Sequence, residues 1–169
     1  MSNNKFILTL MILLALTAAN LRAQNDDGSW KLFTDSAKGV SFRYPETLET
    51  KYINTRIWPP EVQVLNESFT CGETNPGDDG MLKTEQRIIN DNTYCVTEKS
   101  EGAAGTVYIQ YTYAFLKFGR VVNLNFVLGF VQCGNYDNPE KSECEKERRK
   151  FNIDKIIDLI AQTLVIEKG

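Results

Sequence analysis

Alternating polar and apolar residues predict that the segment from Gly105 to Cys133 forms one long β-hairpin. A two-residue loop at Gly119-Arg120, with glycine at the first position of a type II′ turn, defines the register. One face then carries four apolar cross-strand pairs: Phe115 with Leu124, Tyr113 with Phe126, Tyr111 with Leu128, and Ile109 with Phe130. A four-residue loop centred on the same point gives the same pairs, whereas a three-residue loop would mix the two faces.

The C-terminal part of the chain has the spacing of an amphipathic helix. Its apolar residues fall on one stripe: Ile153, Ile156, Ile157, Ile160 and Leu164. Asn152 is placed to cap this helix, with Phe151 and Ile156 as a hydrophobic staple. We expect the stripe to pack on the aromatic face of the hairpin. Before it, Asn138-Pro139 predicts the start of a short charged helix, with Asn138 as the N-cap.

Shorter runs predict further strands: Trp30–Phe33, Gly39–Pro45, Leu48–Ile53, Glu61–Leu65, Lys83–Ile89 and Thr93–Glu98. The two prolines after Trp58 indicate an edge or a loop, and the composition of Cys71–Gly80 predicts another loop. Strands followed by helices are typical of the α+β class. The sequence therefore predicts an antiparallel β-sheet built on a long hairpin and covered by a C-terminal helix.

The first 23 residues have the pattern of an export signal. Lys5 supplies a positive start, the run from Phe6 to Ala19 is almost wholly apolar, and small residues before Gln24 fit a cleavage site. An uncleaved membrane anchor is the alternative, but the apolar run is shorter than the roughly 20 residues that a spanning helix needs. We therefore predict a signal peptide over residues 1–23 and a single domain over 24–169. The mature protein would have no membrane span and a periplasmic or secreted location.

Four cysteines, Cys71, Cys95, Cys133 and Cys144, lie in this exported chain. An even number in an oxidising compartment predicts disulfides, and three connectivities are possible. We favour Cys71–Cys95 with Cys133–Cys144, in which the second bond closes a short loop directly after the hairpin. A four-thiolate zinc site is the alternative. We expect no metal there, because the spacings contain no C-x₂-C pair and the chain has no histidine.

The charge balance argues against some partners. The chain carries 19 basic and 22 acidic residues, a net charge of −3, and two of the basic residues lie in the signal peptide. A protein of this balance, without a basic stripe, is not typical of those that bind nucleic acid or anionic membranes. We therefore expect a protein or a small molecule as the partner.

The residue types present also limit the chemistry. Without histidine, the Ser-His-Asp and Cys-His nucleophilic arrangements are excluded, and paired cysteines would exclude thiolate catalysis. No glycine-rich phosphate-binding motif occurs, and we expect no cofactor. Glu73, Asp78 and Asp79 crowd one loop and could form a weak calcium site. A solvated acidic loop is favoured, because the spacing is not that of an EF-hand.

Candidate binding residues lie on the smaller, more polar face of the hairpin. Tyr108, Gln110, Asn123 and Asn125 share that face, and Trp58 is a further aromatic residue that could line a groove. The aromatic residues of the opposite face are expected in the core. These five residues are therefore our candidate binding surface.

Several of these segments resemble the Mog1/PsbP-like family of small α+β proteins. Lys38–Pro45 (KGVSFRYP) is similar to an early strand of that family, in which glycine and a hydrophobic residue precede Ser-Phe-x-Tyr-Pro. The late hairpin and the C-terminal helix leading into Thr163–Ile166 fit as well, whereas the tryptophan often found soon after Tyr-Pro is absent. The resemblance implies an antiparallel sheet flanked by helices. It implies no catalytic residues, since family members act mainly as binding or assembly factors.

The sequence therefore predicts an exported, disulfide-stabilised binding or assembly module without enzymatic activity. Two alternatives stay open. A small-ligand carrier would have a cavity between the aromatic face of the sheet and the C-terminal helix. A carboxylate-dependent hydrolase would need two acidic side chains at a set separation, which a sequence does not reveal.

Overall fold

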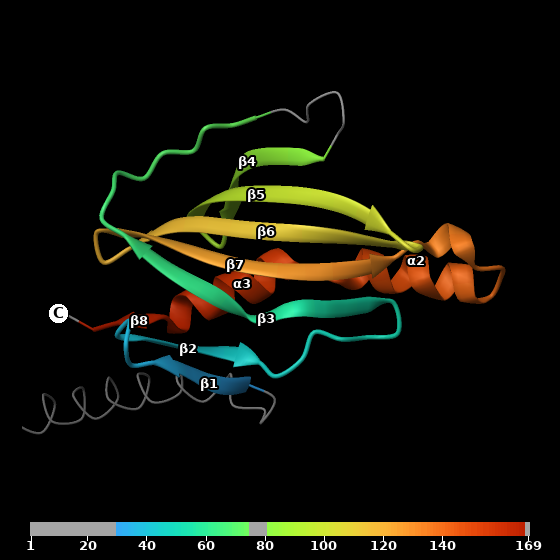
Figure 1. Cartoon of the computed structure of the whole chain (residues 1–169), viewed down its shortest axis with the longest axis horizontal. Coiled ribbons are helices and arrows are strands. Elements are labelled where there is room, and N and C mark those ends of the chain that lie inside the picture. Colours follow the sequence, from blue (N-terminus) through green and yellow to red (C-terminus); the bar gives the residue numbers. More distant parts are fainter. Residues whose placement is uncertain (1–29, 75–80, 168–169) are drawn as a thin grey trace, which may run out of the picture.

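The computed structural model describes residues 30–74 and 81–167 (Figure 1). The strands are β1 (Trp30–Asp35), β2 (Val40–Pro45), β3 (Ile53–Leu65), β4 (Leu82–Ile89), β5 (Asn92–Ala103), β6 (Thr106–Lys117), β7 (Arg120–Val131) and β8 (Val165–Ile166). The helical elements are the short 3-10 helix η1 (Cys133–Asn135), α2 (Glu140–Lys150) and α3 (Ile153–Thr163). None of the helices in the described ranges is long and apolar enough to span a bilayer. The predicted signal peptide lies outside these ranges.

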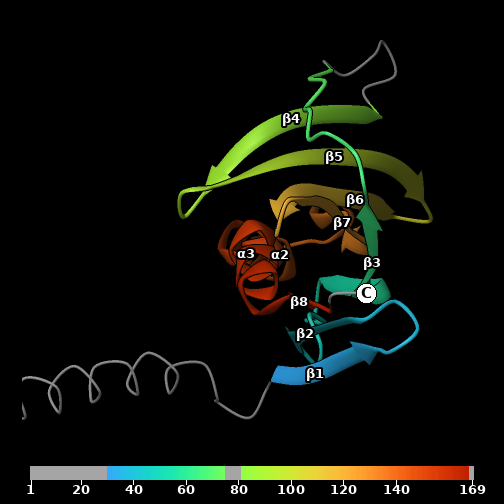
Figure 2. The ribbon, with the colours of Figure 1, turned by 90° about the vertical axis from the view of Figure 1, so that its left-hand side faces the viewer.

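Two antiparallel sheets form the fold. The larger has five strands in the order β3-β7-β6-β5-β4, and the smaller has three in the order β1-β2-β8. Figures 1 and 2 show α3 against one face of the larger sheet and the smaller sheet beyond β3. The prediction of an α+β fold, built on the β6–β7 hairpin and covered by the C-terminal helix, is confirmed.

The hairpin turns one residue earlier than predicted. Lys117 pairs with Arg120, so the loop is Phe118-Gly119 and not Gly119-Arg120. Both loop residues have positive φ, 52° for Phe118 and 75° for Gly119, as a type I′ turn requires. The predicted type II′ turn is wrong, and each predicted partner is displaced by two residues. Because this displacement is even, every residue stays on its predicted face.

The same turn geometry recurs at the two neighbouring hairpins. Asn90-Asp91 joins β4 to β5, and Ala104-Gly105 joins β5 to β6, with positive φ at all four residues. Phe118 is the unusual member, because bulky residues rarely adopt this conformation. Its side chain is 70 % exposed, so little apolar burial offsets the backbone strain.

The apolar stripe of α3 packs on the larger sheet as predicted. Fully buried residues on the two sides of this interface include Ile157, Ile160, Leu124 and Leu128. Burying one such side chain stabilises the fold by roughly 1.5–3 kcal/mol. The predicted N-cap is also confirmed, since the Asn152 side chain accepts a hydrogen bond from the backbone N–H of Lys155 at 2.9 Å.

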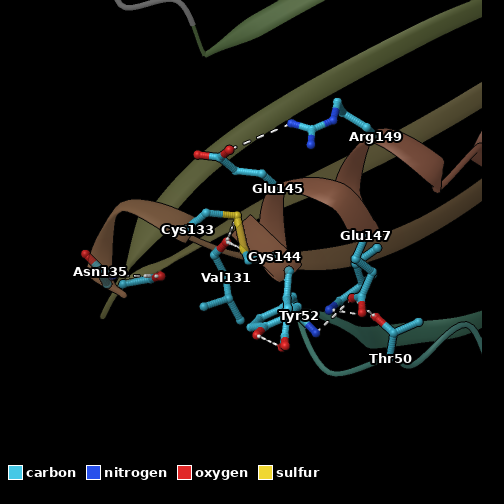
Figure 3. The surroundings of a disulfide bond; sticks show 12 residues. Thr50, Tyr52, Val131, Cys133, Asn135, Cys144, Glu145, Glu147 and Arg149 are labelled. Atoms are coloured by element: carbon cyan, nitrogen blue, oxygen red, sulfur yellow. Dashed lines mark hydrogen bonds and ion pairs between the residues drawn. A yellow bond between two sulfur atoms is a disulfide. The ribbon is translucent and has the colours of Figure 1, made fainter. Parts of the chain in front are cut away.

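Both predicted disulfides are confirmed. Cys133–Cys144 joins η1 to α2 with a Cα–Cα distance of 5.6 Å, and Cys71–Cys95 joins the segment before β4 to β5 with a distance of 5.3 Å. Figure 3 shows the Cys133–Cys144 bond beside Val131, where β7 ends. The bond therefore fixes α2 to the end of the central hairpin.

The start of α2 differs from the prediction. Pro139 occupies the N-cap position and the helix begins at Glu140, one residue later than expected. The Asn138 side chain makes no capping bond, because its Oδ1 accepts a hydrogen bond from Ser142 Oγ at 2.7 Å. A side-chain hydrogen bond therefore takes the place of the predicted cap.

Replacing Phe118 with asparagine is expected to stabilise the protein by roughly 0.5–1 kcal/mol, because asparagine adopts positive φ at lower cost. Denaturant unfolding followed by circular dichroism measures the change. The matched control is Arg120→Asn, which alters a paired strand residue and is expected to be neutral or destabilising. A loss of stability in Phe118→Asn equal to that in the control would contradict the observed turn.

Candidate functional site

The face of the larger sheet away from α3 is here called the outer face (Figure 2). By the alternation of side chains it presents every second residue of β4, β5, β6 and β7. The register places one row across all five strands: Ile57, Val127, Gln110, Lys99 and Leu82. Tyr108 lies in the row on one side of it, and Thr112 and Asn125 lie in the row on the other side. The sheet therefore fixes polar and apolar side chains at set spacings on the face away from α3.

Residues 66–74, here called the crossing segment, run over the outer face from β3 to β4 (Figures 1 and 2). The disulfide Cys71–Cys95 fixes this segment to β5. Thr74 and Thr84 exchange two backbone hydrogen bonds, with N···O distances of 3.0 and 3.3 Å. Before Thr74 the segment has neither helix nor strand, so we infer that the disulfide holds its path over the sheet.

An open hollow of about 440 Å³, here called the trough, lies on the outer face toward the β5–β6 turn. Its lining combines cations, an acid, an aromatic ring, an amide and apolar groups, among them Arg56, Lys99, Glu101, Tyr108, Gln110 and Val127. The volume falls in the usual range of small-ligand sites, roughly 300–1,000 Å³. The structure thus brings two of the predicted residues, Tyr108 and Gln110, into one hollow.

Close packing holds Tyr108 in the trough. A Cβ added at Gly129 would come within 2.9 Å of Tyr108 Cε1 and 2.1 Å of Asn54 Oδ1, so glycine is needed to leave room for both side chains. From β3, Arg56 places its guanidinium carbon 4.2 Å from the centroid of the Tyr108 ring. The ring therefore packs against Gly129, and the cation stacks on the ring.

A second hollow, of about 270 Å³, lies between the crossing segment and the sheet. Asn123 lines it, and among the described side chains the Asn123 Oδ1 is the buried polar atom without a hydrogen-bond partner. Asn125 is satisfied, because its Oδ1 accepts a hydrogen bond from Thr112 Oγ1 at 2.7 Å. The two predicted asparagines share the outer face but differ in their surroundings.

Trp58 lies apart from the other four predicted residues. Its Nε1 donates to the backbone carbonyl of Pro45 at 2.8 Å, and its ring packs edge-on against Tyr44 and Phe126. Phe126 belongs to the buried core. Trp58 therefore packs between β2 and the core face of the larger sheet.

The helix side of the sheet holds a polar cluster that the sequence analysis does not predict. Asp158 of α3 is fully buried. Its carboxylate accepts four hydrogen bonds: from Asn90 and Asn92 at 2.9 Å, from Tyr94 at 2.6 Å and from Gln162 at 2.8 Å. Burial alone would raise the pKa of Asp158, but these hydrogen bonds outweigh it and lower the pKa.

A second group ties α3 to the edge of the sheet. Arg87 of β4 donates to Asp154 at 3.0 Å and pairs with both Glu85 and Glu98 at 2.6 Å. Tyr113 also donates to Asp154. Burial lowers the pKa of Arg87, but its carboxylate partners outweigh that effect and raise the pKa. These contacts fix the orientation of α3 on β4, β5 and β6.

Two sequence features could have revealed this cluster. Tyr94, Tyr111 and Tyr113 all point to the core, where a phenol hydroxyl needs a partner. Asp154 and Asp158 are four residues apart and so share one side of the helix, next to its apolar stripe. Together they indicate tyrosine–aspartate hydrogen bonds across the core. Because Asp158 is closed off from solvent, we assign this cluster to packing.

A third hollow, of about 400 Å³, opens at the end of the interface between the sheet and α3. Tyr94 and Phe115 line it from the sheet, and Ala161 and Gln162 line it from the helix. Lys117 donates to the carbonyl of Ala161 at 2.8 Å, and burial lowers the pKa of Lys117. Of the three hollows, this one lies closest to the sheet–helix interface, where the ligand-carrier alternative predicts a cavity.

No protein-family model matches this chain, and the search of curated proteins finds no match. Within residues 30–74 and 81–167, no three cysteine or acidic side chains are grouped as a metal site requires. Asp78 and Asp79 of the predicted acidic loop lie outside these ranges. The candidate site therefore rests on its geometry.

Asp158→Asn is expected to lower the free energy of unfolding by about 1–3 kcal/mol at neutral pH, because an amide has one oxygen in place of two acceptors and its buried NH₂ group would face donors such as the Tyr94 hydroxyl. Since the folded-state pKa of Asp158 is lowered, its ionisation stabilises the fold above the unfolded pKa and this stabilisation is lost as the pH falls through the folded value. Below about pH 4, wild type should therefore lose stability more steeply than the variant. Denaturant unfolding over a pH series measures both effects. Asp137→Asn, at an exposed position, should follow wild type; parallel pH profiles for wild type and Asp158→Asn would contradict the assignment.

Replacing Cys71 and Cys95 with serine is expected to lower stability by about 2–4 kcal/mol and to free the crossing segment. Hydrogen exchange should accelerate across residues 66–74 while β6 and β7 stay protected. The matched control replaces Cys133 and Cys144, which should also lower stability but leave exchange in the crossing segment unchanged. Equal acceleration in both variants would show that the disulfide does not hold the segment.

Proposed function

We propose that this chain is an exported, disulfide-stabilised binding or assembly module without enzymatic activity, and that its outer face holds the partner. The trough carries this proposal. Its lining comes from neighbouring strands of one sheet and combines an aromatic ring, an amide and charged groups with apolar contact area. In Figure 2, α3 lies against the opposite face, and on the outer face Arg56, Lys99 and Gln110 are exposed to solvent.

The placement of acidic groups favours binding over hydrolysis. Glu101 is the carboxylate in the described lining of the trough, and it is exposed and paired with Lys99 at 3.2 Å. Asp158 is buried on the other side of the sheet among its four donors. A carboxylate-dependent hydrolase would need two acids facing one hollow at a set separation.

A small-ligand carrier is the second candidate, favoured by the third hollow. The middle of the sheet–helix interface is filled by buried side chains such as Leu128 and Ile157, so a carried ligand would bind at its open end, beside Tyr94 and Phe115. An apolar fluorescent probe whose binding is unaffected by substitutions on the outer face would favour this candidate.

The resemblance to the Mog1/PsbP-like family is part of the proposal. The segment that carries it overlaps β2. The resemblance implies an antiparallel sheet flanked by helices, and the antiparallel sheets with the C-terminal helix support it in part. Export is proposed on two grounds. Residues 1–23 have the signal pattern, and paired cysteines are typical of oxidising compartments.

The test is capture of a defined partner by immobilised protein with its disulfides intact. Exported proteins and small molecules of the source cells are passed over wild type, over Tyr108→Ala/Gln110→Ala, and over Lys146→Ala/Arg149→Ala. The last pair lies on the exposed side of α2 and is the matched control. A partner identified on wild type should be retained by the control and bind the outer-face variant at least tenfold more weakly.

Two results would contradict the proposal. A partner held equally by all three proteins would place the binding surface elsewhere. Turnover of an exported polymer that is abolished by Glu101→Gln, with folding unchanged by circular dichroism, would favour the hydrolase instead.

A further inference from the structure

Arg56 lies on the outer face beside an irregularity in β3. Thr55 pairs with the core residue Leu128, so the alternation of the strand places the next residue, Arg56, on the opposite, outer face. The register then passes to Ile57 opposite Val127, so a bulge brings Ile57 to the same face. Arg56 and Ile57 consequently both line the trough.

The guanidinium of Arg56 stacks on the ring of Tyr108. It lies 4.2 Å from the centroid of the Tyr108 ring, and Tyr108 itself packs against the Cβ-free surface of Gly129. Arginine stacks favourably on aromatic faces, which leaves the N–H groups at its edge free to donate. This contact therefore accounts for the position of the Arg56 guanidinium.

The positive charge of Arg56 is not balanced by an ion pair within the described residues. Among the described residues, no carboxylate lies within ion-pair distance of it, whereas Arg87 is within 4 Å of Glu85, Glu98 and Asp154. The second cation of the trough, Lys99, is paired with Glu101 at 3.2 Å. The trough thus offers one uncompensated positive charge, in a chain whose net charge is −3.

We propose that the trough binds a carboxylate group carried on an apolar body, with Arg56 as its bidentate donor. This inference rests on the proposed function and names the ligand class for the same site. Gln110 is placed to donate a further N–H to the ligand, and Ile57 and Val127 supply the apolar contact. A single free cation matches a singly charged carboxylate better than a phosphate dianion, and two parallel N–H···O bonds match the carboxylate geometry.

The test uses three six-carbon probes that differ in the head group: hexanoate, hexanamide and hexyl phosphate. Two-dimensional NMR titrations of the disulfide-intact protein locate and measure binding. We expect hexanoate to shift the amide signals of Arg56, Lys99 and Gln110, with an affinity at least tenfold above that of hexanamide. Hexyl phosphate should bind no more tightly than hexanoate.

Variants of Arg56 separate its charge from its shape. Arg56→Gln should weaken hexanoate binding at least tenfold without changing hexanamide binding, and Arg56→Lys should fall between Arg56→Gln and wild type. Arg149→Gln removes an exposed arginine from α2 and should match wild type. Thermal unfolding of each variant checks that the fold is retained.

The inference would be overturned by hexanoate binding that Arg56→Gln leaves unchanged, by equal affinity for hexanoate and hexanamide, by tighter binding of hexyl phosphate, or by no shift of trough signals at all. Each of these outcomes would reject the carboxylate ligand without rejecting the outer face as the binding surface. A partner that is lost in Tyr108→Ala/Gln110→Ala but retained by Arg56→Gln would keep the outer face as the binding surface and reject the carboxylate.

Discussion

Along β6 and β7, successive side chains point to opposite faces of the sheet, and this period of two constrains every other element. The face that carries Tyr113 and Leu124 has to be covered, and α3 covers it together with residues of the smaller sheet. The opposite face carries Gln110, Thr112 and Asn125 and can remain in water. A second layer is therefore unnecessary there, and the crossing segment that does run over this face is fixed by a disulfide.

The parts of the fold that follow from periodicity could be predicted. The two faces of the hairpin and the stripe of α3 each involve many residues, so one error does not change the assignment. The turn depends on two residues only. Glycine first in the loop favours type II′, but the chain places Phe118 in the left-handed region and forms type I′. The error in the turn leaves every residue on its predicted face of the sheet, because it displaces the cross-strand partners by two residues, an even number.

The candidate site was predictable to the same extent. Tyr108 and Gln110 follow from alternation, and so does their place on the face away from α3. Arg56 could not be predicted, because it lies in residues 54–60, between the predicted strands, where the two prolines indicate an edge or a loop and no alternation identifies a face. Trp58 lies in the same irregular stretch and turns to the core. The path of the crossing segment has no periodic signal, and the Cys71–Cys95 pairing was the single indication that it meets β5.

Charged groups have different surroundings on the two sides of the sheet, and this difference supports our proposal that the outer face binds the partner. On the helix side, Asp154 and Asp158 are fully engaged by Arg87, by buried tyrosine hydroxyls and by amides, so changing any of these groups would first weaken the packing of α3. On the outer face, by contrast, the charged group of Arg56 contributes little to the packing of the fold. The fold stacks Arg56 on the Tyr108 ring, and no carboxylate of the described residues lies within ion-pair distance of it. An exposed stacked cation adds little to stability, and this contrast with the helix side supports our proposal of a ligand carboxylate in the trough.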